Sequence, residues 1–117
     1  MKKFSYKWLG HATFLFTTPG GKRVLLDPWI TGNPVTPESA RKTGDIDLIL
    51  LSHGHADHTS DAVSLGRSSG AQVVAPYELS LWLQQKGLKN VTGMNPGGTL
   101  RMLGLEITMV QADHSSS

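Results

Sequence analysis

The sequence has no cysteine, little charge and no long apolar run. Asp, Glu, Lys and Arg make up 17% of its 117 residues and hydrophobic residues 38%, a balance that argues against disorder. The missing thiols exclude disulfide scaffolds, thiolate zinc fingers, iron–sulfur clusters and cysteine nucleophiles. A cysteine-free chain fits a reducing compartment, and no apolar run approaches the roughly 18 residues of a membrane span. We therefore expect a cytoplasmic protein with no membrane partner.

The chain also lacks concentrated positive charge. Eleven Lys and Arg against nine Asp and Glu give a net charge of +2, and no three basic residues are adjacent. Proteins that follow a nucleic-acid backbone need a clustered basic surface. We therefore expect no nucleic-acid partner.

The apolar pattern predicts one mixed α/β domain over residues 1–117. Short strands separated by Gly- and Pro-containing turns indicate a β-hairpin at 13–26, and residues 31–44 are expected to form a loop. Two strands joined by a helix should be parallel neighbours. The predicted strands are 4–8, 13–16, 23–26, 48–51, 71–75 and 105–111, and the predicted helices run from Thr59 or Ser60 to 69 and from 76 to 86.

Four potential metal ligands follow the apolar strand 48–51 within six residues. His53 and His55 are two residues apart, so in extended backbone they point the same way, about 6.6–7 Å apart at Cα. Both imidazoles can therefore converge on one cation. Asp57 and His58 lie where the chain turns into the predicted helix, and they can face a second cation beside the first.

This ligand set contains only nitrogen and oxygen donors, which suit Zn²⁺ but also Mn²⁺ or Fe²⁺. Two such cations, about 3.5–4 Å apart, can activate water and polarise the bond that it attacks. We predict two Zn²⁺ ions, with Gly54 and Ala56 as the small residues needed where backbone crowds the metals. A polar surface loop and a single-metal or structural site are the simpler alternatives.

The pattern His53-x-His55-x-Asp57-His58 after an apolar strand resembles the metallo-β-lactamase superfamily. The segments 8–13, 26–30 and 32–34 are similar to the branch of metal-dependent hydrolases that includes the L-ascorbate-6-phosphate lactonases. The resemblance covers nearly the whole chain. It implies an α/β (α+β) fold, the αββα sandwich of two mixed sheets with helices outside, of which this chain would hold the N-terminal half.

The resemblance also implies roles for individual residues. His53 and His55 would bind the first metal together with His114, which follows the last predicted strand. Asp57 and His58 would be ligands of the second metal. Asp57 is also the catalytic candidate that orients the attacking water. The alternative for His114 is an ordinary histidine at the end of a strand.

Other polar and aromatic residues have alternative interpretations. His11, after a glycine at a strand boundary, is either a substrate-facing donor, as the resemblance suggests, or a hydrogen-bonded structural histidine. For Asp27, which ends a strand, we favour hydrogen bonding beneath the metal loop over simple turn formation. We interpret Trp29 and Trp82 as packing residues and Asp113 as a solvated carboxylate.

The sequence departs from the family pattern after the third metal motif. Members are usually much longer and supply a bridging Asp and a last His, so the second metal here would keep only Asp57 and His58. Three explanations are open. The chain is a fragment, it is a half that pairs with a second copy or a complementing half, or it is a member with one metal.

We therefore expect a metal-dependent hydrolase of a small ester, lactone, amide or phosphoester. The missing ligands favour a first alternative, a non-catalytic metal-binding or assembly half-domain. A second alternative is a nuclease of the same superfamily, against which the scattered basic residues argue.

Overall fold

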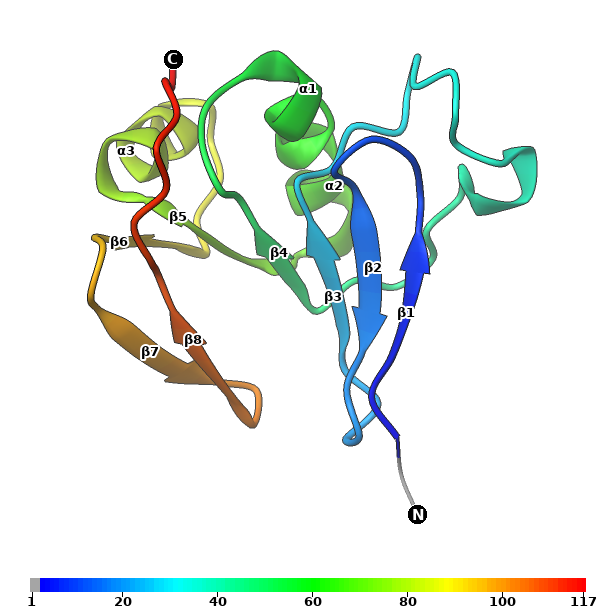
Figure 1. Cartoon of the computed structure of the whole chain (residues 1–117), viewed down its shortest axis with the longest axis horizontal. Helices are drawn as coiled ribbons and strands as arrows, with labels where there is room; N and C mark the ends of the chain where they lie inside the picture. Colours follow the sequence, from blue (N-terminus) through cyan, green and yellow to red (C-terminus); the bar gives the residue numbers. More distant parts are fainter. Residues whose placement is uncertain (1–2) are drawn as a thin grey trace.

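A six-stranded mixed sheet with helices on one face and a two-stranded ribbon on the other organises the chain (Figure 1). The computed structural model describes residues 3–117, so residues 1 and 2 of the predicted domain lie outside the described part. Within residues 3–117, no helix is long and apolar enough to cross a membrane. The strands are β1 (Ser5–Trp8), β2 (Phe14–Thr17), β3 (Arg23–Leu26), β4 (Leu48–Leu50), β5 (Gln72–Pro76), β6 (Val91–Met94), β7 (Thr99–Met102) and β8 (Leu105–Thr108), and the helices are η1 (Glu38–Ala40), α1 (Ala56–Thr59), α2 (Ala62–Ser69) and α3 (Tyr77–Gln85).

The strands of the large sheet lie in the order β1-β2-β3-β4-β5-β6. The β1–β2 and β2–β3 pairs are antiparallel, and β3 to β6 pair in parallel. The predicted hairpin and the predicted parallel pairing of the strands at 48–51 and 71–75 are therefore confirmed. Because parallel strands end at the same edge of a sheet, the segments that follow β3 and β4 meet there.

The two faces of the sheet bury different side chains because successive strand residues point to opposite sides. On β3, β4 and β5 one set packs with the helices, together with Leu83 of α3. The alternate set packs with the ribbon β7–β8. The first set consists of Leu25, Ile49 and Val73, and the second of Val24, Leu48 and Val74. The central strands are thus covered on both faces, as their continuous apolar sequence predicts.

Several elements differ from the sequence-based prediction. Strands β6 and β7 were not predicted, because their short mixed sequences VTGM and TLRM carry no apolar run. The predicted strand 105–111 ends at Thr108, and the predicted loop 31–44 contains η1. The helix predicted to follow Thr59 or Ser60 begins only at Ala62 as α2, and a separate helix, α1, precedes it. The Asp61 carboxylate accepts hydrogen bonds from the backbone amides of Ile30 and Thr31. It therefore does not cap the N-terminus of α2, although aspartate is a preferred residue at that position.

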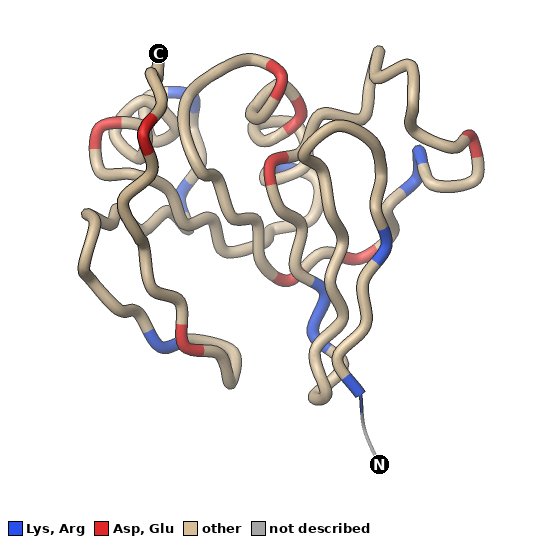
Figure 2. The backbone as a smooth tube through the Cα atoms, viewed as in Figure 1, with Lys and Arg blue, Asp and Glu red and all other residues tan. Residues whose placement is uncertain are grey.

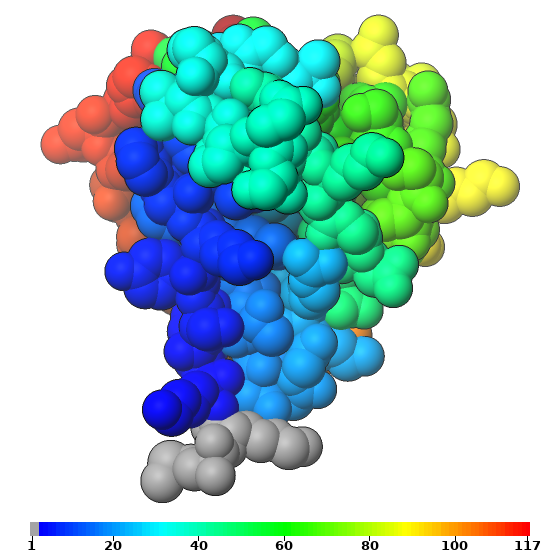
Figure 3. Space-filling view, turned by 90° about the vertical axis from the view of Figure 1, so that its right-hand side faces the viewer, coloured from blue at the N-terminus to red at the C-terminus, as the bar shows by residue number. Residues whose placement is uncertain are grey.

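An exposed aromatic surface lies along the edge strand β1, which forms an uncovered strip below the loop of residues 31–44 (Figure 3). Phe4, Tyr6 and Trp8 are all more than half exposed, and Tyr6 reaches 68%. The rings of Phe4 and Tyr6 contact Phe16 on the neighbouring strand, with centroids 5.6 and 6.4 Å apart. Edge strands with apolar side chains associate with other chains.

We expect the 117-residue chain to dimerise or aggregate through this edge. Sedimentation velocity at micromolar concentration should show species heavier than a monomer. The Tyr6→Lys variant should shift the distribution toward the monomer, whereas Lys7→Ala on the same strand should not. A monomeric wild-type chain with a cooperative thermal melt would contradict this prediction.

Candidate metal centre

All seven site residues predicted from the sequence lie at the edge of the sheet where β3 and β4 end. The loop after β4 and helix α1 carry four of them, the β1–β2 connection carries His11, and Asp27 directly follows β3. The chain after β8 crosses beside the loop and brings in His114 (Figure 1). The four residues of the loop and α1 are His53, His55, Asp57 and His58.

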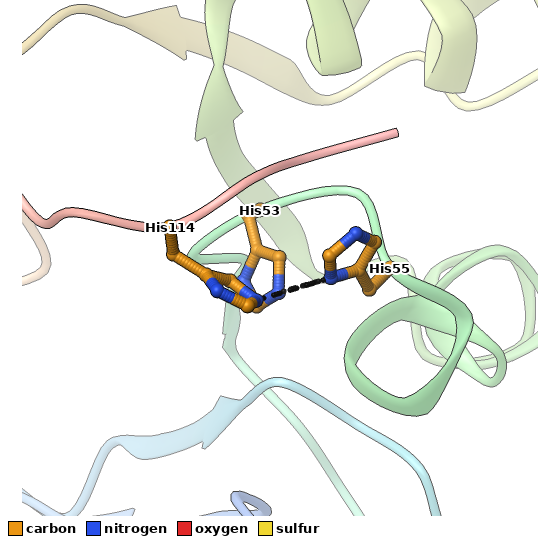
Figure 4. A group of neighbouring side chains, drawn as sticks. All are labelled: His53, His55 and His114. Atoms are coloured by element: carbon orange, nitrogen blue, oxygen red, sulfur yellow. Dashed lines mark hydrogen bonds between the residues drawn. The ribbon is translucent and has the colours of Figure 1, made fainter.

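Three of these histidines converge on one point (Figure 4). His53 Nε2 lies 3.1 Å from His55 Nδ1, and His114 Nε2 lies 3.2 Å from the same atom. A single imidazole nitrogen has one proton or one lone pair, so His55 Nδ1 cannot form two full hydrogen bonds. Tetrahedral zinc, about 2.0–2.1 Å from each nitrogen, would hold ligand atoms roughly 3.3–3.4 Å apart. The donor set and its spacing therefore fit a divalent cation.

A second group lies beside the first and consists of His11, Asp57 and His58. His11 Nε2 is 3.0 Å from Asp57 Oδ2, and His58 Nε2 is 3.9 Å from Asp57 Oδ1. The rings of His53 and His58 have centroids 4.2 Å apart, so the two groups are contiguous. The structure therefore brings all five predicted metal ligands and His11 into one cluster.

Asp27 is buried next to this cluster and holds it through hydrogen bonds. The residue is 3% exposed, and its carboxylate accepts hydrogen bonds from the Ser52 amide, the Ser52 hydroxyl and His58 Nδ1. An ionised carboxylate only accepts, so the His58 proton lies on Nδ1 and its Nε2 lone pair points at the second group.

Ser52 extends the same hydrogen-bond chain to His53. Its single hydroxyl proton is donated to Asp27, so the contact of 2.9 Å with His53 Nδ1 requires the imidazole to donate. This leaves the lone pair of His53 Nε2 directed at the first group. One buried carboxylate thus sets the tautomers of two candidate ligands, a common arrangement around bound metals. Ser52 was not predicted from the sequence, because its hydrogen bond with Asp27 spans 25 positions.

The pKa of the Asp57 carboxyl lies below its ordinary value. Desolvation acts to raise it, but the charge of His58, the backbone amide of Asp57 and the hydrogen bond with His11 outweigh that effect. The carboxylate is therefore ionised at neutral pH and can accept a proton or orient a donor.

Burial lowers the pKa of His53, and the neighbouring His58, His55 and His114 lower it further, although Asp27 opposes them. The unfolded chain has an ordinary histidine pKa of about 6.5 and so binds more protons at mildly acidic pH. We therefore expect the metal-free fold to lose stability as pH falls through 6.5 toward the folded pKa. Side-chain NMR titration should place the His53 midpoint below 6.5, and a midpoint above 6.5 would contradict this.

Gly54 provides room for the chain that carries His114. Its amide donates to Ser116 Oγ at 2.9 Å, and Ser117 Oγ donates to its carbonyl. A Cβ at position 54 would lie 1.7 Å from the Ser117 carbonyl oxygen. The glycine is therefore required by the close approach of residues 114–117, and not only by crowding around the metals as predicted.

We expect Gly54→Ala to displace residues 114–117 and to weaken cation binding by about 10–100-fold, the cost of losing a supporting contact. Gly20→Ala is the matched control, because a Cβ there meets only Thr18 Oγ1 at 3.8 Å. Competition with a chromophoric zinc chelator measures both variants. Equal zinc affinity for Gly54→Ala and Gly20→Ala would refute the role of this contact.

A cavity of about 1160 Å³ borders His53 and His114 and runs between α1, α3 and residues 109–117. Trp82, interpreted from the sequence as a packing residue, is 42% exposed and lines it. Trp29 packs as predicted, with its ring edge-on to His11. The described lining contains no Lys or Arg. Its apolar wall consists of Val63, Leu79, Trp82, Met94 and Met109.

Comparison with known proteins identifies the family. The family profile described as "Beta-lactamase superfamily domain" matches residues 5–117. The chain belongs to this superfamily. It is 48% identical over 110 residues to a UPF0173 metal-dependent hydrolase of Rubrobacter xylanophilus, covering 94% of this chain and 46% of that protein. A relative of the same name from Herpetosiphon aurantiacus is 46% identical over 120 residues, covering 100% and 50%.

A solved structure has the same fold. Igni18, described as a novel metallo hydrolase from Ignicoccus hospitalis, superimposes with a TM-score of 0.86 at 31% identity, covering 97% of this chain and 50% of that one. The superfamily membership and the metallo-β-lactamase-like fold inferred from the sequence are thus confirmed. The chain spans about half the length of the curated relatives that it matches.

Proposed function

We propose that this chain carries the metal site of a hydrolase that cleaves a small ester, lactone or amide. The observation that carries the proposal is the convergence of His53 Nε2, His55 Nδ1 and His114 Nε2 within 4.8 Å of one another. The names of the relatives, metal-dependent hydrolases, support the same chemistry. Two Zn²⁺ ions are the proposed cofactors, with Mn²⁺ or Fe²⁺ as alternatives.

Each residue of the cluster has a defined task in this proposal. His53, His55 and His114 would hold the first cation, and Asp57 and His58 the second. When bound, such cations supply Lewis acidity, which activates water and polarises the scissile bond. The Asp57 carboxylate, which is ionised at neutral pH, would orient the attacking water and accept its proton. Asp27 keeps His58 in the tautomer that faces the site.

The cavity favours an uncharged substrate over a phosphoester. Among its described lining residues, the only carboxylate is Glu78, and there is no Lys or Arg to neutralise a phosphate. Its apolar wall, next to His53 and His114, suits the non-reacting part of an ester, lactone or amide. The basic residues are spread along the chain without forming a continuous stripe in the view of Figure 2, which gives no support to a nuclease.

Hydrolysis assays on metal-loaded chain test this function. We expect turnover of a chromogenic lactone or p-nitrophenyl ester in Zn²⁺ or Mn²⁺, its loss with chelator, and little turnover of bis-p-nitrophenyl phosphate. His55→Ala should be inactive on every substrate. Cation binding without any turnover would support the metal-binding or assembly half-domain instead, and faster cleavage of the phosphodiester would overturn the substrate class.

A further inference from the structure

We propose that His11 is the third protein ligand of the second cation, together with Asp57 and His58. This inference rests on the proposed metal-dependent function and extends it, because it gives the second position three ligands from within this chain. The three residues offer donor atoms that all lie within 4.8 Å of one another. They come from the β1–β2 connection and from α1, 46 positions apart in the sequence.

His58 Nε2 and the Asp57 carboxylate are placed so that one cation can contact both. The Asp27 carboxylate lies 2.8 Å from His58 Nδ1 and occupies that nitrogen, which leaves Nε2 on the side of Asp57. Nε2 lies 3.9 Å from Asp57 Oδ1, too far for a hydrogen bond, so a cation between them would displace no direct contact. His11 Nε2 reaches the other oxygen of the same carboxylate at 3.0 Å.

The backbone holds the His11 ring toward this position at an energetic cost. His11 has φ +53°, a left-handed conformation that is unfavourable for a non-glycine residue. Trp8 Nε1 donates to the His11 carbonyl at 2.9 Å. The Trp29 ring packs edge-on against the imidazole, with centroids 5.5 Å apart. Strained residues that neighbours hold in place are typical of functional sites.

The position remains open to solvent, as a catalytic site requires. The side chains of His11 and Asp57 are 45% and 46% exposed. A cation with three protein ligands on one side keeps coordination positions for water or substrate on the other. Two imidazoles and one carboxylate suit Zn²⁺, Mn²⁺ and Fe²⁺.

Titration with Co²⁺ and Zn²⁺ tests this assignment, with stoichiometry from calorimetry and coordination from the visible Co²⁺ spectrum. We expect two equivalents for the wild type. His11→Asn and His11→Ala should keep the first equivalent unchanged and weaken the second by more than the roughly 10–100-fold cost of losing an outer partner. Asparagine tolerates the left-handed backbone, and a third variant, His11→Gln, places its amide nitrogen near the position of Nε2, where it can donate to Asp57, so His11→Gln separates ligation from hydrogen bonding.

The outcomes separate this inference from the proposed function. Two equivalents with wild-type affinity in His11→Asn would overturn the role of His11 alone. A wild-type chain that binds one equivalent, lost in His55→Ala, would overturn the second position and leave the first. Less than one equivalent in the wild type would overturn the metal-dependent function itself. Thermal melts of His11→Asn and His11→Ala close to that of the wild type show that the fold is retained.

Discussion

Replacing Asp27 with alanine should destabilise the fold by about 3–5 kcal/mol, because it leaves several hydrogen-bond donors unsatisfied at about 1–3 kcal/mol each. Its carboxylate is the acceptor for the Ser52 amide, the Ser52 hydroxyl and His58 Nδ1. Without it these donors are left unpaired beneath the loop. Asp27 also has φ +47°, which alanine adopts less readily than aspartate. Urea unfolding of the metal-free chain measures the loss.

Asp27→Asn is the matched control. Asparagine tolerates the left-handed backbone, and its amide oxygen can still accept from Ser52, so the cost should be only about 1–2 kcal/mol. The asparagine carries no charge and so holds the His58 tautomer less firmly. An Asp27→Ala variant within 1 kcal/mol of the wild type would show that this network does not stabilise the loop.

His55→Ala should abolish binding of the first cation, lowering its affinity by more than 100-fold, or about 2.7 kcal/mol. His55 Nδ1 is the atom that both His53 Nε2 and His114 Nε2 approach, so its loss separates the group. Zinc competition with a chromophoric chelator gives the affinity.

Asp113→Ala is the comparison variant for His55→Ala. This exposed carboxylate precedes His114 but belongs to neither candidate ligand group. Zinc affinity should therefore match that of the wild type. If Asp113→Ala weakens binding as much as His55→Ala does, the ligand assignment is wrong.

The sequence predicted the parts of the site that depend on local spacing. The strand 48–51 and the histidine pair after it are contiguous in sequence, so their geometry follows from period-two alternation and from the end of a buried strand. His114 was assigned through family resemblance and its place after the predicted strand 105–111, but that strand ends at Thr108 and residues 109–117 have no regular secondary structure. The fold class could be predicted because β4 and residues 73–75 of β5 form continuous apolar runs.

The features of the site missed from the sequence depend on distant contacts. The hydrogen bond of Ser52 with Asp27 spans 25 positions, and that of Gly54 with Ser116 spans 62. Strands β6 and β7 carry no apolar run. The position of His11 beside Asp57 arises because the β1–β2 connection and α1 meet at one edge of the sheet.

Metal analysis tests the central claim most directly. Inductively coupled plasma spectrometry of the chain, purified without chelators and dialysed, should find about two equivalents of transition metal, and about one in His55→Ala. Less than one equivalent in the wild-type chain, even after incubation with Zn²⁺ or Mn²⁺, would contradict the claim that these histidines form a metal centre.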